Sequence, residues 1–158
     1  MPDSIALVLL IAGALGAGLI GGVFYAFSTF VMGALRRLPA EQGIAAMQSI
    51  NVVVINPLFL GRFMGTALLC VAIAIDAAVD WSAGSSLRIA GSAAYTIGTF
   101  GITMVCNVPL NNALARATPD EEGQRLWSYY LRRWTLWNHV RTAAAVVALG
   151  CFLLSAGS

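Results

Sequence analysis

Charged residues are scarce in this chain of 158 residues, and lysine is absent. Only 10% of the residues are charged, whereas 59% are hydrophobic, and all nine basic residues are arginines. Soluble domains usually carry about 25% charged residues, so the composition excludes an ordinary soluble protein. The arginines flank apolar runs and form no continuous basic surface, which argues against a nucleic-acid partner. The sequence therefore predicts an integral membrane protein in contact with lipid.

Side chains that bind metals or carry thiol chemistry are also few. The chain has one histidine and three cysteines, Cys70, Cys106 and Cys151, which lie singly in apolar runs without a C-x-x-C motif. A thiol–disulfide relay is therefore not expected, and we interpret the cysteines as small buried hydrophobic residues. Haem, di-iron and copper sites usually take several histidine or carboxylate ligands. We predict no metal and no cofactor, with haem bound through one histidine left open as an alternative.

Long apolar runs rich in Ala, Leu and Gly make up most of the chain. A membrane-spanning helix needs roughly 20 apolar residues, and the lack of alternation argues against β-strands. The first run is too long for a signal peptide and follows no positive residues, so we expect it to remain as a span. The predicted fold is an all-α integral membrane four-helix bundle with up-down topology, forming one domain over residues 1–158. The expected spans cover about 5–35, 58–77, 87–109 and 137–154, with spans two and three kinked at Pro57 and Pro109.

The positions of the arginines indicate an orientation in the membrane. The connections before spans two and four are rich in arginine, whereas the connection between spans two and three holds Asp76, Asp80 and Arg88. By the positive-inside rule, the two arginine-rich connections face the cytoplasm. Both termini are then extracytoplasmic, in what we expect to be a bacterial inner membrane. The arginines of the two connections are Arg36, Arg37, Arg116, Arg125, Arg132 and Arg133.

Polar side chains lie near the span ends that an up-down bundle brings together. The densest group opens span four and includes the single histidine, and such residues inside a membrane indicate a functional site by default. At about 100° per residue, Trp134, Asn138 and Arg141 share one helix face, with Trp137 at its edge. His139 projects to a different side, so His139 and Arg141 cannot both face the bundle centre. The sequence leaves open which of the two does so.

The other spans carry polar or aromatic stripes at helical spacing, and we expect all of them to line one pocket near the cytoplasmic leaflet. Three alternatives remain open: Asn107 and Asn111 cap the broken backbone of span three, the tryptophans form an interfacial belt, and Arg62 reaches toward the headgroups. The stripes are Tyr25, Ser28, Thr29 and Met32 in span one, Asn51, Asn56 and Arg62 around the start of span two, and Phe100, Thr103, Asn107 and Asn111 in span three.

Two further features concern helix ends and helix packing. Thr118 is predicted to cap the helix that leads into span four, with Pro119 in its first turn. A ridge of small residues in span one includes Gly18 and Gly22. Such a ridge allows helices to approach closely, either within the bundle, which we favour, or in a homo-oligomer.

Several of these residues also carry a family resemblance. The motifs occur in a fixed order along nearly the whole chain, and together they resemble the signature of the anthrone oxygenase family. They are Phe24-Tyr25-Ala26-Phe27-Ser28, Gln48-x-x-Asn51 with Asn56-Pro57, Cys106-Asn107-Val108-Pro109-Leu110-Asn111, and Trp134-x-x-Trp137-Asn138-His139-Val140-Arg141.

The resemblance implies that a flat lipophilic aromatic molecule, an anthrone, is oxidised by O2 to an anthraquinone without a metal or flavin. His139 is then the natural base, since its pKa is ordinarily near neutrality, and Asn138 and Arg141 complete the expected catalytic group. The expected substrate-binding residues are Tyr25, Asn56, Arg62, Phe100, Asn107, Asn111, Trp134 and Trp137. The alternatives are a non-catalytic membrane protein that binds a quinone or lipid in the same pocket, and a structural partner without a pocket.

Overall fold

Helices account for almost all of the chain in the computed structural model, which describes residues 3–118 and 120–157. These two ranges contain no strand, which confirms the all-α prediction. The elements, in which η denotes a π-helix, are α1 (Asp3–Ala26), η1 (Phe27–Val31), α2 (Met32–Arg36), α3 (Ala40–Val53), α4 (Pro57–Val79), α5 (Ser85–Ala93), η2 (Ala94–Gly101), η3 (Thr103–Asn107), α6 (Val108–Ala115) and α7 (Glu121–Ser155).

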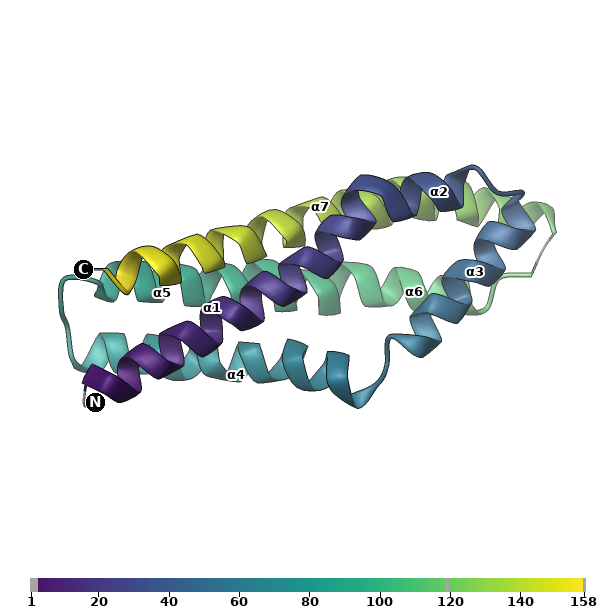
Figure 1. The fold of residues 1–158 in the computed structure, drawn as a ribbon. Coiled ribbons are helices and arrows are strands. Elements are labelled where there is room, and N and C mark those ends of the chain that lie inside the picture. Colours follow the sequence, from purple (N-terminus) through teal and green to yellow (C-terminus); the bar gives the residue numbers. More distant parts are fainter. Residues whose placement is uncertain (1–2, 119, 158) are drawn as a thin grey trace.

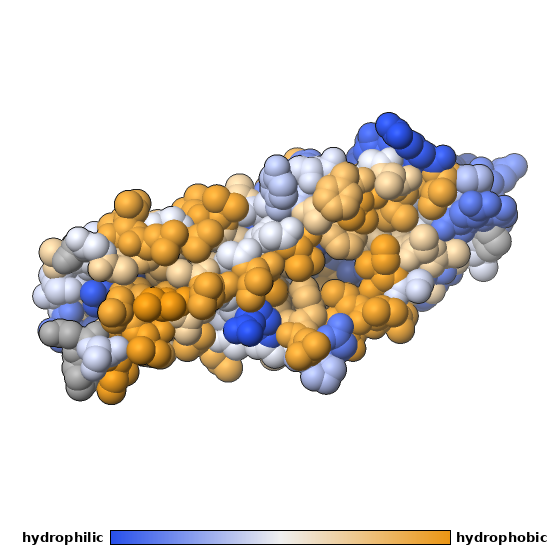
Figure 2. Space-filling model, viewed as in Figure 1, coloured by the Kyte–Doolittle hydropathy of each residue, from blue (hydrophilic) through white to orange (hydrophobic). Residues whose placement is uncertain are grey.

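Four helical rods are long and apolar enough to cross a membrane, and each contains one of the predicted runs. Figure 1 shows them side by side along one axis, with both chain ends at the same end of the molecule. Apolar side chains cover most of the face drawn in Figure 2, and hydrophilic ones gather mainly toward the end that carries α2 and α3. These features indicate an integral membrane protein. The rods are Ser4–Arg36, Pro57–Val79, Ser85–Ala115 and Glu121–Ser155.

The helix is interrupted completely before span two. The kink predicted at Pro57 within one continuous helix is therefore wrong. α3 ends at Val53 and α4 begins at Pro57, so the proline occupies the first turn of a new helix, where its missing N–H is no loss. Asn56 is the N-cap of α4: its Oδ1 accepts from Phe59 N at 3.0 Å, and its Nδ2 donates to Val53 O at 2.9 Å. The break is therefore stabilised locally, and α3 can leave the direction of α4 (Figure 1).

The irregularity expected near Pro109 takes the form of π-helix. The third rod passes through η2 and η3 before α6 begins at Val108, which places Pro109 in the first turn of α6. A further π-helical turn, η1, interrupts span one. No sequence pattern predicted π-helix in either span.

Asp120, and not Thr118, is the N-cap of α7. Its Oδ1 accepts from Gly123 N at 2.8 Å, and its Oδ2 accepts from the Thr118 hydroxyl at 2.6 Å. These hydrogen bonds lower the pKa of the exposed Asp120 carboxyl, and the bond from Thr118 has the largest effect. The carboxylate cap is therefore fully effective above the unfolded-state pKa and is lost as the pH falls through the lowered folded-state value. The predicted role of Pro119 lies outside the described residues.

Two hydrophobic clusters fill the bundle, one after the other along its length. The first includes Phe24 of α1 and Phe63 of α4, and the second includes Met47 of α3 and Trp134 of α7. Burial of apolar side chains does not itself drive helix association in lipid, so shape fit between the rods matters more. The seam between the two clusters is where the polar residues of the next section lie.

Small residues allow α1 to pack closely on its neighbours. A Cβ added at Gly16 would collide with the Thr66 hydroxyl of α4, and one added at Gly18 would lie 3.6 Å from Leu149 of α7. A Cβ at Gly22 would meet nothing within 4 Å. Of the two glycines named in the predicted ridge, Gly18 thus faces α7 within the bundle, and an oligomer through Gly22 stays a prediction.

Candidate functional site

Arg141 on α7 is a charged side chain buried at the seam between the two clusters. It is 5% exposed. Its Nε and Nη2 donate to Asn138 Oδ1 at 3.0 and 2.7 Å, and its Nη1 donates to the Thr103 hydroxyl of η3 at 3.3 Å. A guanidinium stays ionised in proteins, and burying a charge is costly unless it is paired and hydrogen-bonded.

Asn138 connects this cation to α1. Its Nδ2 donates to Phe24 O and to the Ser28 hydroxyl, both at 2.7 Å, while its Oδ1 accepts from Arg141. The amide therefore has its donor and acceptor ends fixed by different helices. Thr142 completes the group, because its hydroxyl donates to Asn138 O at 2.6 Å and lies 3.2 Å from that of Ser28.

Two aromatic rings flank the guanidinium. Arg141 Cζ lies 3.7 Å from the ring centroid of Phe24 and 4.8 Å from that of Trp134. A cation over an aromatic face is attracted to it, more strongly where water is excluded. The N–H groups of a guanidinium point outward in its plane, so a ligand would bond to its edge.

All three π-helical segments contribute to this site. Ser28 belongs to η1, Thr99 to η2 and Thr103 to η3. The Thr99 hydroxyl donates to Arg141 O at 3.2 Å, and Thr103 accepts from the Arg141 side chain. π-Helix makes up well under 1% of residues in globular proteins and is found frequently at functional sites. Three such segments around one arginine make this region the candidate functional site.

A second polar layer lies beside Trp134. Trp134 Nε1 and the Tyr130 hydroxyl both donate to Asn111 Oδ1 at 2.8 Å, and Asn107 Nδ2 donates to Trp134 O at 3.2 Å. Asn51 of α3 lies beside Tyr130. One buried atom of this layer, Asn107 Oδ1, has no hydrogen-bond partner. The layer thus retains an unused acceptor.

No carboxylate among the described residues forms an ion pair with Arg141. Two ion pairs among the described residues lie far from Arg141. They join Arg88 to Asp76 at 4.0 Å and Arg125 to Glu121 at 3.8 Å. Asn138 and Thr103 offer the guanidinium neutral oxygens only. The site is therefore cationic, and an anionic group in a ligand would supply the missing counter-charge.

The structure brings together five of the residues proposed from the sequence. Asn138 and Arg141 form the centre, Trp134 covers it, and Asn107 and Asn111 form the second layer. Phe100 is close by but belongs to the apolar cluster, where it stacks on Phe63 with ring centroids 5.2 Å apart.

His139 is not part of this group. It is exposed on the outer side of α7, whereas Asn138 and Arg141 are buried. The reason is helical phase: positions 138 and 141 lie on one face, and position 139 is rotated by about 100° from 138. Of the two candidates for the bundle centre, Arg141 faces it.

Four other expected residues also lie outside the group. Tyr25 is 60% exposed because Phe24 and Ser28, not Tyr25, turn inward from this part of span one. Asn56 is occupied as a helix cap, and Arg62 is exposed. Trp137 is half-buried, and the Arg133 Cζ lies 5.7 Å from its ring centroid.

The assembled side chains are packed against one another. Asn107 and Asn138 are 0% exposed, and both rings beside Arg141 are buried. The sequence analysis expected them to line an open cavity, but the guanidinium and the rings fill the seam themselves. A ligand must therefore separate existing contacts to enter.

The sequence analysis missed Phe24, Thr99 and Thr142 as members of the site. Phe24 contributes through its ring and its backbone carbonyl, and a carbonyl contact has no sequence signal. Thr142 lies four residues after Asn138 and Phe24 four residues before Ser28. Extending each stripe by one helical turn would have found both.

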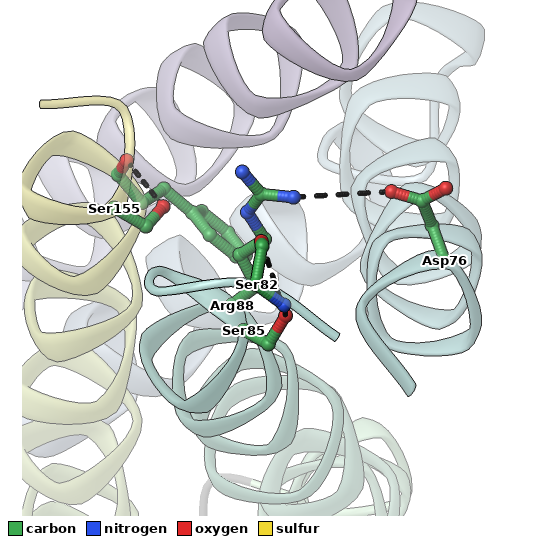
Figure 3. Close-up of polar contacts among 6 residues, drawn as sticks. Asp76, Ser82, Ser85, Arg88 and Ser155 are labelled. Carbon is green, nitrogen blue, oxygen red and sulfur yellow. Dashed lines mark hydrogen bonds and ion pairs between the residues drawn. The ribbon is translucent and has the colours of Figure 1, made fainter. Parts of the chain in front are cut away.

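A second polar cluster lies at the opposite end of the bundle, where α4 is joined to α5. Figure 3 shows the Arg88 guanidinium reaching from α5 toward Asp76 of α4, with Ser82 and Ser85 at the start of α5. Ser85 Oγ accepts from Ser82 N at 2.9 Å, which stabilises the turn. These contacts join helix ends, and we interpret the cluster as structural.

The described residues contain no group of three or more His, Cys, Asp or Glu side chains placed to hold a metal ion. Fold and site together define a helical integral membrane protein with a buried cationic polar centre. The chain belongs to the anthrone oxygenase family, whose model matches residues 56–151. The match contains Asn107, Asn111, Trp134, Asn138 and Arg141. Comparison with curated proteins and with solved structures found no match. Family membership supports an oxygenase-like role in general.

Proposed function

We propose that this protein is a cofactor-independent membrane oxygenase that oxidises a flat lipophilic anthrone to an anthraquinone with O2. The observation that carries the proposal is the buried Arg141, which has hydrogen-bond partners but no carboxylate partner among the described residues. Such a group suits a substrate whose reacting form is an anion. Family membership supports the same type of reaction.

The reaction needs stabilisation of an oxyanion more than it needs a catalytic metal. Loss of a proton from the methylene carbon of an anthrone gives an aromatic phenolate. This anion passes one electron to O2, and the resulting carbon radical and superoxide combine to a peroxide, which takes up a proton. Loss of the second methylene hydrogen with the terminal OH, as water, leaves the new carbonyl. One oxygen atom of O2 thus enters the quinone and the other leaves in water.

Arg141 is the group that we assign to the phenolate oxygen. Its hydrogen bonds use three of five N–H groups, so two remain for a ligand at the guanidinium edge. A donor that the protein holds in place stabilises developing charge better than water molecules, which must first reorient. The proton of the methylene group then passes to solvent base, since His139 faces away. The flat ring system would enter along the seam beside Phe24 and Trp134.

The test is anthrone turnover by purified protein in detergent, followed by O2 uptake and by the absorbance of the quinone. We expect Arg141→Gln to lower kcat/KM by about 10²- to 10³-fold, and Arg141→Lys to retain part of the activity because it keeps the charge. Arg62→Gln is the matched control, since Arg62 is exposed and lies outside the site. Thermal unfolding of each variant shows whether the bundle is intact.

Two outcomes would contradict the proposal. A folded Arg141→Gln protein with unchanged turnover would exclude the assigned role of Arg141. A wild-type protein that binds anthraquinone without oxidising anthrone would favour the alternative, a non-catalytic membrane protein that binds a quinone or lipid at the same place.

A further inference from the structure

Asn107 holds an unused hydrogen-bond acceptor inside the site. The side chain is 0% exposed, and its Nδ2 donates to Trp134 O at 3.2 Å. Its Oδ1 is buried and has no partner. An unsatisfied buried polar atom costs about 1–3 kcal/mol, and native structures contain few of them. A fully buried asparagine that satisfies only its donor end therefore requires an explanation.

The position of Asn107 relates this acceptor to Arg141. Asn107 follows Thr103 by one helical turn, and Thr103 accepts from Arg141 Nη1. Asn107 is also bonded to the backbone of Trp134, whose ring flanks the same guanidinium. The free acceptor thus lies in the layer next to the cationic edge, and the two do not bond to each other.

The combination of a cationic donor edge with a separate neutral acceptor selects a particular ligand chemistry. The donor edge suits an oxygen that carries negative charge. The acceptor suits a hydroxyl, because an ether or carbonyl oxygen has no hydrogen to donate. A hydroxyl on the carbon nearest the ring carbonyl would form an intramolecular hydrogen bond to the carbonyl oxygen. The hydroxyl that Asn107 could bind is therefore one at a ring position away from the carbonyl.

We propose that Asn107 is a specificity residue, whose Oδ1 accepts a hydrogen bond from a phenolic hydroxyl of the substrate while Arg141 binds the ring oxyanion. The proposal rests on the proposed function and narrows it to anthrones with a free hydroxyl away from the carbonyl. Sites built to bond a hydroxyl reject analogues that lack it, because their own polar atom is then left unpaired.

The experiment compares anthrone, its 2- and 3-hydroxy derivatives and the corresponding methyl ethers. For at least one hydroxyl position, we expect wild-type kcat/KM to exceed that of its ether by about tenfold, the effect of one neutral buried hydrogen bond. Asn107→Leu should reduce this ratio to about one, whatever its effect on the turnover of unsubstituted anthrone. Asn112→Leu is the matched control, because Asn112 is exposed on α6, and it should keep the full ratio.

Binding of the non-reacting hydroxy- and methoxyanthraquinones, measured by quenching of tryptophan fluorescence, separates this inference from the proposed function. If wild type does not oxidise anthrone, the proposed function fails, and the same hydroxyl-to-ether ratio in dissociation constants still tests Asn107. Should Asn107→Leu not fold, Asn107→Ala removes the same acceptor with less bulk. Equal affinity for hydroxyl and ether in wild type, no binding of either, or an unchanged ratio in the Asn107 variants would overturn the inference.

Discussion

The amide of Asn138 determines the orientation of the Arg141 guanidinium. Its Nδ2 is held by α1 through Phe24 O and the Ser28 hydroxyl, so its oxygen is directed at the guanidinium. With Oδ1 bonded to both Nε and Nη2 and the Thr103 hydroxyl bonded to Nη1, one N–H on each Nη is left for a ligand. An asparagine thereby orients an arginine without neutralising it, whereas an aspartate at the same position would do both.

The exposed position of His139 predicts that this residue is not the catalytic base. We expect His139→Gln to retain anthrone turnover within about twofold of wild type, because His139 is exposed and Asn138 and Arg141 are buried on another face of α7. The measurement is initial rate against pH between 5 and 8, the range in which an ordinary histidine titrates.

A catalytic base would give a different result. A fall of about 10²-fold or more in the variant, with folding intact, would show that His139 turns toward the substrate during the reaction. The matched control is Asn138→Leu, which should impair turnover because it releases Arg141 from α1.

At the scale of the element, the π-helical turns hold the polar residues in position. An i→i+5 turn accommodates one residue more than an α-helical turn. Removing one residue from η1 should therefore restore α-helix and leave Met32 and Leu35 buried. It should also shift Ser28 relative to Asn138, which it contacts at 2.7 Å.

We expect deletion of the exposed Thr29 to leave a folded protein with anthrone turnover lowered about 10²-fold, as displacement by about 1 Å can do. Deletion of Leu15, which is exposed in the regular part of α1, is the control. It would rotate one part of α1 by about 100° against the other and should prevent folding. Normal turnover after deletion of Thr29 would show that the π-helical turn is dispensable.

The elements also show which features could be predicted from the sequence. The four apolar rods follow from hydrophobic content, and the shared face of Trp134, Asn138 and Arg141 follows from helical phase. π-Helix could not be predicted in this way, because it changes the helical phase on which the prediction depends. The stripe expected through Tyr25 was therefore one position away from the buried Phe24. Nor could spacing show that Asn56 serves as a cap, since capping depends on where the chain breaks.

Orientation belongs to the scale of the whole molecule, and we propose that both termini are extracytoplasmic. Arginines gather beside α2 and on both sides of the turn before α7, and the positive-inside rule assigns such segments to the cytoplasm. The test uses alkaline phosphatase, which is active only outside the cytoplasm. A fusion at the C-terminus should be active, and a fusion after Ala117 should be inactive. The reverse pattern would contradict the orientation.

The buried arginine also has a consequence for how the chain enters the membrane. α7 is the least apolar of the four rods and carries Arg141 within its span, which is unfavourable for an isolated helix in lipid. Arg141 donates to Thr103 of η3 and to Asn138, whose amide is in turn bonded to α1 and η1. All three elements are synthesised earlier. We therefore expect the first and third rods to be in place beside the translocon before the fourth can leave it.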